Sequence, residues 1–425
     1  MSRWEGKYVI GLTGNIAVGK SVVRRMLQQL GAYTIDADGL SHQAMEPGAP
    51  AYKPVVATFG NFILDSENRI NRAMLGQIVF SNPTALAKLE AIVHPIVNQV
   101  VNVLIKRAKQ PVIVIEAIKL LEGNLASAVD TVWVVDATPQ TQLRRLVEKR
   151  GMSPQDAQQR VAAQNAQSDK VARANYVIKN DGNVEETFRA VQTGWNNVLR
   201  EIGVQRAPAP ERPPTVKPIQ PRPPQQTTPP PAPPQPSTAP PTDQQPPVPV
   251  APPAQTTAES QDLDLDVRRG MPSNAEAIAQ FITMVSEKTV ERMDIMMAFG
   301  EKSYLLAQDK DERMVGLIGW QVENLITRVD EVYLTPDVPQ MSLVRTLVEA
   351  TEDASRDLQS EVSFIFLPKE TPQPVIDAFL KAGYDYLKLE TIKFPAWREA
   401  AHERMSSELV GLMKQLREDR VMKPI

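Results

Sequence analysis

The chain has no cysteine among its 425 residues, which excludes disulfides, thiolate nucleophiles and thiolate metal ligands. It has only 3 histidines, and they lie far apart in sequence, which argues against a histidine-rich metal site. An excess of charge of one sign is also lacking, because 47 Lys and Arg residues oppose 50 Asp and Glu residues. This balance predicts no nucleic-acid partner and no attraction to an anionic membrane surface.

Long hydrophobic runs are lacking as well. No stretch approaches the roughly 18 consecutive apolar residues of a membrane span, and the first eleven residues have no apolar core of a signal peptide. The apolar fraction of 42% is nevertheless enough to form hydrophobic cores, and the length predicts two or three domains. We therefore expect a soluble, cytoplasmic protein.

Proline is abundant but unevenly distributed. Most of the 37 prolines fall in residues 207–261, among Gln, Thr and Ala. Such a segment buries too little apolar surface to fold, so we expect a disordered linker. The linker separates a domain at residues 1–206 from one at residues 262–396, which a C-terminal segment, residues 397–425, follows. We expect the two domains to be mechanically independent and residues 1–206 to be active alone.

Before the linker, apolar runs alternate with segments of helical spacing. The runs lie at residues 8–13, 111–115, 131–135 and 176–178, and the helical segments at residues 21–30, 139–150 and 184–200. Strands separated by helices predict an α/β domain with a parallel sheet covered on both faces.

After the linker the order changes. Three strand-like runs with short connections lie at residues 303–307, 314–323 and 326–334, and further strands are expected at residues 264–269, 362–367 and 386–392. Helices are expected at residues 274–285, 341–358 and 373–382. This order predicts an α+β domain on a mixed or antiparallel sheet.

The strongest motif begins at Gly14 and ends in Gly19-Lys20-Ser21, a full match to the P-loop pattern G-x-x-x-x-G-K-[ST]. A predicted strand enters it and a predicted helix leaves it. Glycines let the backbone N–H groups point at phosphate, the lysine adds charge, and the Ser21 hydroxyl ligates Mg²⁺. The motif predicts binding of ATP and Mg²⁺ by Gly14, Asn15, Ile16, Ala17, Val18, Gly19, Lys20, Ser21 and Val22.

Two carboxylates follow the next predicted strand, at Asp36 and Asp38. In a small-molecule kinase such a carboxylate accepts the proton of the attacking hydroxyl. A strand-end aspartate that caps a helix is the alternative for one of the two.

At this point the chain resembles the dephospho-coenzyme A kinase family, over about residues 9–202. The stretch from Ile35 to Asp38 is similar to that family's signature, and a series of short matches follows in order. They include Pro47-Gly48, Phe59-Gly60, Ile70-Asn71-Arg72, Leu89-Glu90, His94-Pro95, Leu121-Glu122, Asp136, Arg144, Arg150-Gly151, Arg160 with Gln164, and Asn180-Asp181-Gly182.

The resemblance implies a P-loop fold with a helical substrate region and a lid, and the phosphorylation of dephospho-coenzyme A by ATP. It also implies residue roles: Asp38 as base with Asp36 in support, Lys20 and Arg144 in catalysis, Arg150, Asn180 and Gly182 at the nucleotide, and Arg72, His94 and Leu121 at the substrate. His94 before Pro95 has the alternative reading of a helix end.

Two departures from the family pattern concern the site. Asn15 stands where the family's loop usually has a second glycine, and residues 118–122 differ from the family's stretch near the substrate. A kinase of another nucleoside-like alcohol and a non-catalytic ATP-binding regulatory protein therefore remain alternatives.

The domain at residues 262–396 resembles a GNAT acyltransferase fold by its element order. The GNAT fold binds the coenzyme A pyrophosphate on a glycine-rich loop, but residues 335–345 here contain two prolines, an aspartate and no glycine. We therefore expect a non-catalytic module. Residues 397–425 carry an apolar stripe at spacings of three and four, which predicts an amphipathic helix capable of self-association.

Overall fold

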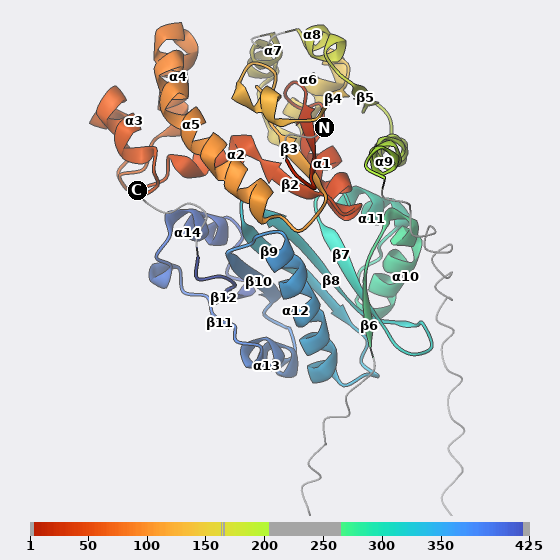
Figure 1. Cartoon of the computed structure of the whole chain (residues 1–425). Helices are drawn as coiled ribbons and strands as arrows, with labels where there is room; N and C mark the ends of the chain where they lie inside the picture. The colour runs from red at the N-terminus through yellow and green to blue at the C-terminus, as the bar shows by residue number, and fades with distance from the viewer. Residues whose placement is uncertain (1–3, 163, 165, 204–264, 420–425) are drawn as a thin grey trace, which may run out of the picture.

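The computed structural model describes residues 4–162, 164, 166–203 and 265–419. The segment predicted as a linker lies outside these residues. The chain forms two domains, each with one sheet and its own helices. In Figure 1 the first domain, in red to green, is drawn above the second, in cyan to blue.

The first sheet is parallel throughout, in the strand order β2-β3-β1-β4-β5. Its strands are β1 (Tyr8–Thr13), β2 (Tyr33–Asp36), β3 (Val112–Glu116), β4 (Thr131–Asp136) and β5 (Tyr176–Lys179). Every residue of β3 is buried, as expected of a continuous apolar strand covered on both faces. The predicted parallel sheet is confirmed.

Helices cover both faces of this sheet. Apolar residues of α1 (Lys20–Gln29) and α9 (Val184–Glu201) pack on one face. On the other face pack α2 (Ala37–Ala44) and α5 (Pro83–Arg107), with α3 (Tyr52–Phe59) and α4 (Arg72–Ser81) beyond them. A third group, α6 (Pro139–Arg150), α7 (Pro154–Ala162) and α8 (Gln167–Ala172), lies above the carboxyl edge of the sheet (Figure 1).

The second sheet has the order β11-β12-β10-β9-β8-β7-β6. Its strands are β6 (Asp266–Arg269), β7 (Ser303–Gln308), β8 (Met314–Glu323), β9 (Ile326–Leu334), β10 (Val362–Pro368), β11 (Asp385–Tyr386) and β12 (Leu409–Gln415). Among the described strands of this second sheet, only β9 and β10 pair in parallel. The sheet is mixed, as predicted.

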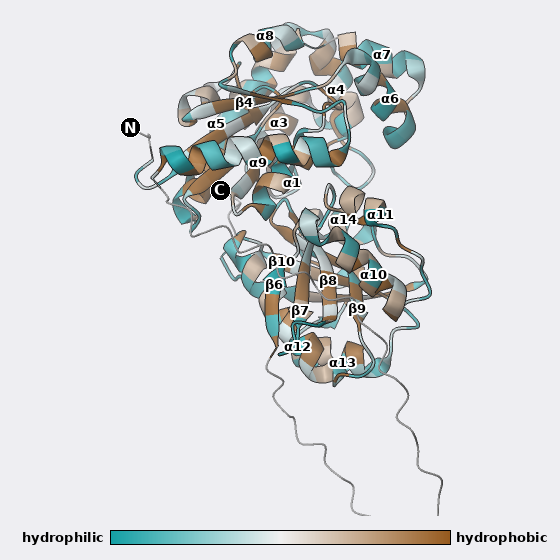
Figure 2. Cartoon of the chain, turned by 90° about the vertical axis from the view of Figure 1, so that its right-hand side faces the viewer, coloured by the Kyte–Doolittle hydropathy of each residue, from teal (hydrophilic) through white to brown (hydrophobic). Residues whose placement is uncertain are grey.

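The helices of this second domain are α10 (Ala275–Val285), α11 (Arg292–Ala298), α12 (Gln340–Asp357), α13 (Gln373–Lys381) and α14 (Pro395–His402). Residues from α10 and α11 form one core with the sheet, and residues from α12 and α13 form another. The central strands β7 and β8 are coloured largely as hydrophobic in Figure 2, in agreement with their burial.

Two predictions for the end of the chain are wrong. The helix predicted for residues 397–425 ends at His402 within α14, and Leu409–Gln415 forms β12 instead. The apolar residues there pair with β10 in an antiparallel ladder, so sheet pairing overrides the helical spacing. The structural basis for self-association through such a helix is thereby removed. The strand predicted at residues 386–392 is reduced to β11 and a 3₁₀ turn at Leu389–Thr391.

The expected mechanical independence of the two domains is also wrong. Side chains of α1 donate hydrogen bonds to the second domain: Arg25 to the Gly300 carbonyl (2.7 Å) and Gln29 to the Phe299 carbonyl (3.0 Å). Lys109 pairs with Asp357 at 2.8 Å. Such bonds tie the first domain to the second across a shared interface.

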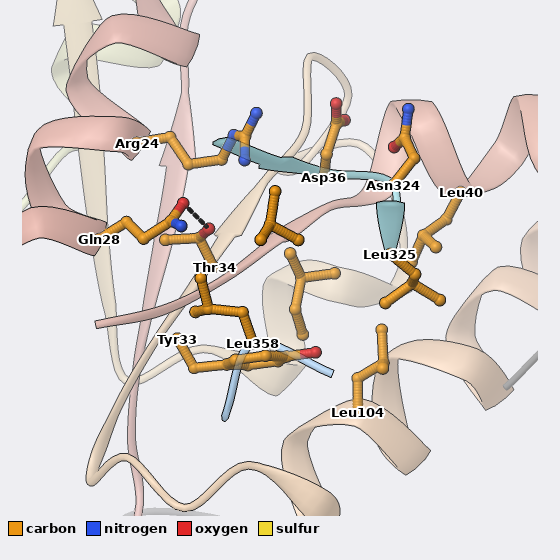
Figure 3. A pocket seen from close by; sticks show the side chains of 12 residues that line it. Arg24, Gln28, Tyr33, Thr34, Asp36, Leu40, Leu104, Asn324, Leu325 and Leu358 are labelled. Carbon is orange, nitrogen blue, oxygen red and sulfur yellow. Dashed lines mark hydrogen bonds between the residues drawn. The ribbon is translucent and has the colours of Figure 1, made fainter. Parts of the chain in front are cut away.

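Apolar side chains meet at the same interface. A small pocket between the domains is lined by Tyr33 and Leu104 from the first and by Leu325 and Leu358 from the second (Figure 3). These residues belong to one cluster of buried side chains that runs through both domains. The hydrophobic effect therefore favours a packed pair of domains, which proline content alone does not predict. None of the described helices is long and apolar enough to cross a bilayer.

Candidate active site

The loop between β1 and α1 has the backbone of a phosphate-binding turn. Gly14 and Gly19 have φ angles of 147° and 98°, and Ala17 has a φ of 58°. A Cβ atom would lie 2.4 Å from the Val135 carbonyl oxygen at Gly14 and 2.1 Å from the Asn180 amide nitrogen at Gly19. Both glycines are thus required by geometry, and the predicted strand–loop–helix context is confirmed.

The outer side of this loop is held by polar side chains. Asn180 donates from Nδ2 to the Val18 carbonyl at 2.7 Å, and Arg145 donates from Nη1 to the Ala17 and Val18 carbonyls at 3.1 and 3.0 Å. In a trans peptide the N–H points opposite to the carbonyl. The following N–H groups, of Val18 and Gly19, are therefore turned away from these two side chains.

Arg145, next to the predicted Arg144, is the arginine that holds the loop. Arg144 is exposed, whereas Arg145 also bonds the Asn180 carbonyl at 2.7 Å. The helical phase explains the difference, because Arg145 lies three residues after buried Gln142 and one before buried Leu146. The catalytic role of Arg144 stays a prediction.

The segment from α6 to α8 corresponds to the lid that the family resemblance implies. Two glutamines of this lid accept hydrogen bonds from the loop backbone. Gln167 accepts from the Asn15 N–H at 2.9 Å, and Gln164 accepts from the Ile16 N–H at 2.8 Å. Gln164 belongs to the predicted lid motif, while Gln167 at the start of α8 carried no signal. The lid is thus in direct contact with the first half of the loop.

The two predicted carboxylates have different roles in the fold. Asp36 accepts from the Gly39 N–H at 2.9 Å and caps α2, as the helix-capping alternative foresaw for one of them. Asp38 accepts from the Ile118 N–H at 3.0 Å. Burial, assisted by the nearby Asp36 charge, raises the pKa of Asp38 to about 6. A carboxylate with such a pKa is suited to accept a proton near neutral pH.

Lys20 is buried beneath the loop and donates to the Asn15 carbonyl at 3.2 Å. Burial lowers the pKa of Lys20, while the carboxylates of Glu116 and Asp38 oppose that shift. The charges of Lys170 and Arg150 lower the pKa of Lys20 further, so all these charged groups influence the site around Lys20. Arg150 is itself exposed at the end of α6.

Glu116 is a site residue that the sequence did not single out. It ends β3 and accepts from the Ser21 hydroxyl at 3.2 Å and from Arg24 Nε at 2.7 Å. Its signal was its position, since it terminates an apolar parallel strand whose carboxyl edge also carries the loop. Lys170, buried and bonded to the Ile118 carbonyl at 2.8 Å, had no comparable signal.

The residues predicted at the substrate are Arg72, His94 and Leu121. Arg72, the first residue of α4, pairs with Glu46 at 2.7 Å. His94 is half-buried inside α5, which continues past Pro95, so a helix end at this point is excluded. The Leu121 carbonyl accepts from Arg173 at 3.2 Å. The structure places these three on separate elements and brings none of them into a hydrogen bond with Asp38.

The predicted nucleotide residues Asn180 and Gly182 follow β5. The amide of Asn180 is committed to the Val18 carbonyl and to the Thr187 hydroxyl. A Cβ atom at Gly182 would lie 2.0 Å from the Glu186 carboxylate. Val22 lies in the first turn of α1 and is half-buried against the adjoining core. Asn180 therefore supports the loop from behind.

The donor set suits a hard cation. Among the described residues there is no cluster of three or more His, Cys, Asp or Glu side chains that could hold a metal alone. The Ser21 hydroxyl and the Glu116 carboxylate nevertheless meet at 3.2 Å, and Mg²⁺ prefers few protein oxygens together with phosphate oxygens. The residues present fit Mg²⁺ bound with a nucleotide.

A profile of the family described as dephospho-CoA kinase matches residues 8–186. The dephospho-CoA kinase of Geobacter metallireducens is 45% identical over 196 residues, which cover 98% of that protein and 45% of this chain. The chain belongs to the dephospho-CoA kinase family. The enzyme of the same name from Geobacter sulfurreducens is 42% identical over 190 residues, 96% of its length and 44% of this chain. Family membership makes the first domain a kinase that uses ATP.

These relatives end before the second domain begins. A GNAT-family acetyltransferase from Staphylococcus aureus matches in structure, with 12% identity and a TM-score of 0.28, over 36% of this chain and 99% of its own. Values this low support no statement about the second domain's activity.

Proposed function

We propose that the first domain transfers the γ-phosphoryl group of ATP to the ribose 3′-hydroxyl of dephospho-coenzyme A, with Asp38 as the base. One observation supports this most: the Asp38 carboxylate, with a pKa of about 6, lies beside a complete phosphate loop. It accepts a hydrogen bond from the Ile118 N–H, and its charge raises the pKa of Lys20 in that loop. The kinase family to which the chain belongs supports the substrate.

In this proposal the loop binds the nucleotide. The N–H groups of Val18 and Gly19 point away from the side chains that hold the loop, and the N-terminus of α1 adds further donors for the phosphates. Lys20 supplies positive charge to the β- and γ-phosphate oxygens, and Lys170 and Arg150 add to the same field. Arg145 and Asn180 keep the loop in this conformation.

The 3′-oxygen attacks the γ-phosphorus, the bond from that phosphorus to the β,γ-bridging oxygen breaks, and ADP leaves. The proton of the 3′-hydroxyl passes to Asp38. Asp36, fixed as the cap of α2, contributes negative charge that raises the pKa of Asp38.

Mg²⁺, when bound with the nucleotide, neutralises phosphate charge. Ser21 and Glu116 are the residues that would hold it, Ser21 through its hydroxyl and Glu116 through its carboxylate. Arg72, His94 and Leu121 remain proposed contacts of dephospho-coenzyme A.

An ADP-release assay on the full chain tests the proposal. Dephospho-coenzyme A, adenosine, AMP and a set of other nucleosides are compared as acceptors at equal concentration. We expect release of ADP with dephospho-coenzyme A, matched mole for mole by coenzyme A. A higher kcat/KM with another nucleoside would make the chain a different kinase, and ATP binding without turnover on any acceptor would make it a regulatory protein.

A further inference from the structure

The turn between β8 and β9 carries the second domain onto the catalytic segment of the first. Asn324 and Leu325 have φ angles of 51° and 65°, as a tight hairpin turn requires. Gln43 of α2 donates to the Asn324 carbonyl at 2.7 Å, and a Cβ atom at Gly39 would lie 2.2 Å from Asn324 Oδ1. Gly39 directly follows Asp38, so the hairpin turn lies against the helix that carries the base.

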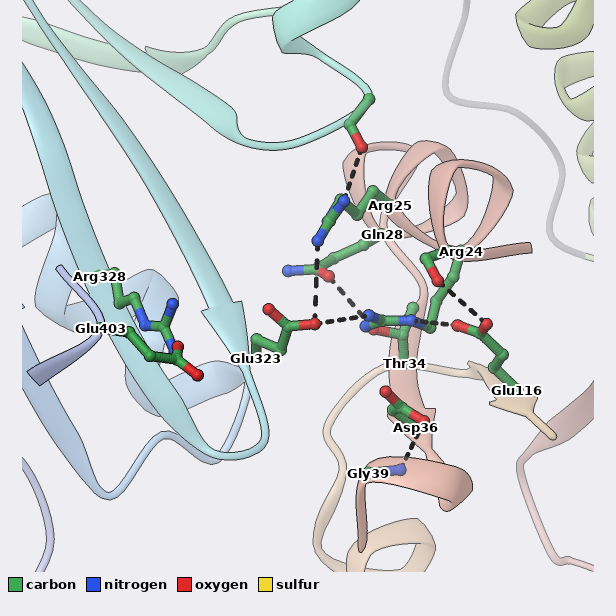
Figure 4. A network of polar contacts seen from close by, with 12 residues as sticks. Arg24, Arg25, Gln28, Thr34, Asp36, Gly39, Glu116, Glu323, Arg328 and Glu403 are labelled. Atoms are coloured by element: carbon green, nitrogen blue, oxygen red, sulfur yellow. Dashed lines mark hydrogen bonds and ion pairs between the residues drawn. The ribbon is translucent and has the colours of Figure 1, made fainter. Parts of the chain in front are cut away.

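Glu323, the last residue of β8, lies at the same contact. Its Oε1 atom is 4.0 Å from Arg24 Nη2 and 3.9 Å from Arg25 Nη2 (Figure 4). Arg25 is also anchored in the second domain through the Gly300 carbonyl at 2.7 Å. One carboxylate of the second domain therefore lies within ion-pair distance of two arginines of α1.

Arg24 links this carboxylate to the active site. Its side chain is only 4% exposed, and its Nε atom donates to Glu116 Oε2 at 2.7 Å. A guanidinium so deeply buried needs carboxylate partners to offset its desolvation. Arg24 thus lies between two carboxylates, Glu116 of its own domain and Glu323 of the other.

The two oxygens of Glu116 are divided between partners. Oε2 receives Arg24 and Oε1 receives the Ser21 hydroxyl at 3.2 Å. Arginine and carboxylate prefer a bidentate pair that uses both oxygens. While Glu323 attracts the Nη2 end of Arg24, that bidentate pair is disfavoured and Oε1 stays with Ser21.

We propose that Glu323 is a positioning residue of the kinase reaction, which acts through Arg24 to hold Glu116 against Ser21. The second domain thereby completes the active site of the first. The inference depends on the proposed function, because its main effect is on the phosphoryl transfer assigned there.

The test compares Glu323→Gln with Asp357→Asn in the full chain. Asp357 forms an interdomain ion pair with Lys109 at 2.8 Å, and neither residue contacts the loop, so it is a matched control for loss of an interface charge. We expect Glu323→Gln to lower kcat about five-fold, as befits a partly exposed pair, with KM for dephospho-coenzyme A within two-fold. Asp357→Asn should leave both constants unchanged.

A binding measurement reads the same effect without turnover. Calorimetric titration with ADP, with and without Mg²⁺, should show that Glu323→Gln loses part of the Mg²⁺-dependent gain in affinity and keeps the affinity for free ADP. Equal losses in both titrations, or equal effects of Glu323→Gln and Asp357→Asn, would overturn the proposal. If the wild-type chain does not phosphorylate dephospho-coenzyme A, the proposed function fails while this titration still decides the role of Glu323.

A double-mutant cycle shows whether Glu323 acts through Arg24. Arg24→Lys keeps the charge but loses the planar fork. In the Arg24→Lys background Glu323→Gln should lower kcat by less than two-fold, because the guanidinium through which Glu323 acts is already absent. An undiminished five-fold loss there would contradict the proposed route. Should Glu323→Gln fold poorly, Glu323→Asp, which retracts the charge by one methylene, should show a smaller loss of the same kind.

Discussion

The helices α1 and α12 each follow a strand and a loop, one in each domain, and they begin in opposite ways. α1 follows a loop with glycines at positive φ and has Gly19 as its N-cap, so its backbone N–H groups are available to an anion. α12 follows residues 335–339, has Pro339 as its N-cap, and has no side-chain cap. The loop before α1 therefore suits a phosphate, whereas the two prolines and the aspartate before α12 do not.

The segment before α12 is held by polar contacts of Asp337. The Thr335 hydroxyl donates to the Asp337 carboxylate, and Arg313 Nη1 donates to the same carboxylate at 2.9 Å. Two prolines in this segment lack an N–H, and Asp337 places negative charge where a phosphate would need positive charge. The comparison teaches that the preceding loop decides whether a helix N-terminus suits a phosphate: glycines at positive φ and a buried lysine favour it before α1, and prolines with an aspartate oppose it before α12.

Removing the positive charge of Lys20, beneath the loop before α1, should have the largest effect. We expect Lys20→Ala to lower kcat/KM by on the order of 10³-fold, because Lys20 is buried beneath the loop and supplies charge to the transferring phosphate. Lys106→Ala, which removes an exposed lysine of α5, is the control and should keep full activity. Steady-state kinetics and circular dichroism measure the two variants. A folded Lys20→Ala protein with near-normal turnover would remove the loop from the mechanism.

Loss of the base should come next. Asp38→Asn should lower kcat by on the order of 10²-fold while ATP affinity changes little, because the carboxylate acts on the acceptor hydroxyl and not on the nucleotide. Asp36→Asn is the comparison, with an expected effect through α2 and the pKa of Asp38. If Asp36→Asn abolishes turnover and Asp38→Asn does not, the two carboxylates are assigned in the wrong order.

The raised pKa of Asp38 predicts opposite trends for activity and stability. The base is active when deprotonated, so kcat/KM should fall as the pH drops through about 6. The folded state binds this proton more tightly than the unfolded state, whose value is 3.8, so the group's contribution to stability is full below 3.8 and lost as the pH rises through about 6. Urea unfolding from pH 4 to pH 7 should show this trend, and Asp38→Asn should reduce it.

Adjacent arginines of α6 offer a matched pair. Arg145→Ala should weaken ATP binding about ten-fold, because the Ala17, Val18 and Asn180 carbonyls lose their shared donor. Arg144→Ala should change affinity by less than two-fold, since its side chain is exposed. Calorimetry with ATP distinguishes them, and the reverse ranking would show that the sequence-based choice of Arg144 was right.

The smallest effect is expected at Asp337, in the segment before α12. Asp337→Ala removes a partly exposed ion pair and should lower the free energy of unfolding by at most about 1 kcal/mol, with the kinase rate unchanged. Urea denaturation and the ADP-release assay measure the two quantities. Wild-type binding of acetyl-coenzyme A that Asp337→Ala weakens would contradict the closure of this helix start.

The loop and the parallel sheet could be predicted because their signals are local. Glycine spacing, an apolar strand before Gly14 and helical spacing after Lys20 act within a few residues of one another. The alternation of strands and helices and the carboxylates at the end of β2 were predicted from signals of the same local kind. Such features depend on short-range backbone geometry, which a sequence states directly.

The errors share a different origin, which is tertiary contact. β12 is a strand because β10 offers it a partner, and the domains pack together because Tyr33 and Leu104 meet Leu325 and Leu358. The contacts of Arg145 with the loop also arise only in the folded chain. Glu323 could not be linked to Ser21 from sequence, because they are joined only through Arg24 and Glu116 in the folded chain.

The position of the transferred phosphate tests the central claim most directly. The full chain is incubated with ATP, Mg²⁺ and dephospho-coenzyme A, and the product is analysed by ³¹P NMR and mass spectrometry, with a 3′-deoxy analogue as a matched acceptor. The account predicts one added phosphoryl group on the ribose 3′-oxygen and no transfer to the analogue. Phosphorylation of the analogue, or a phosphate on any other oxygen of dephospho-coenzyme A, would contradict it.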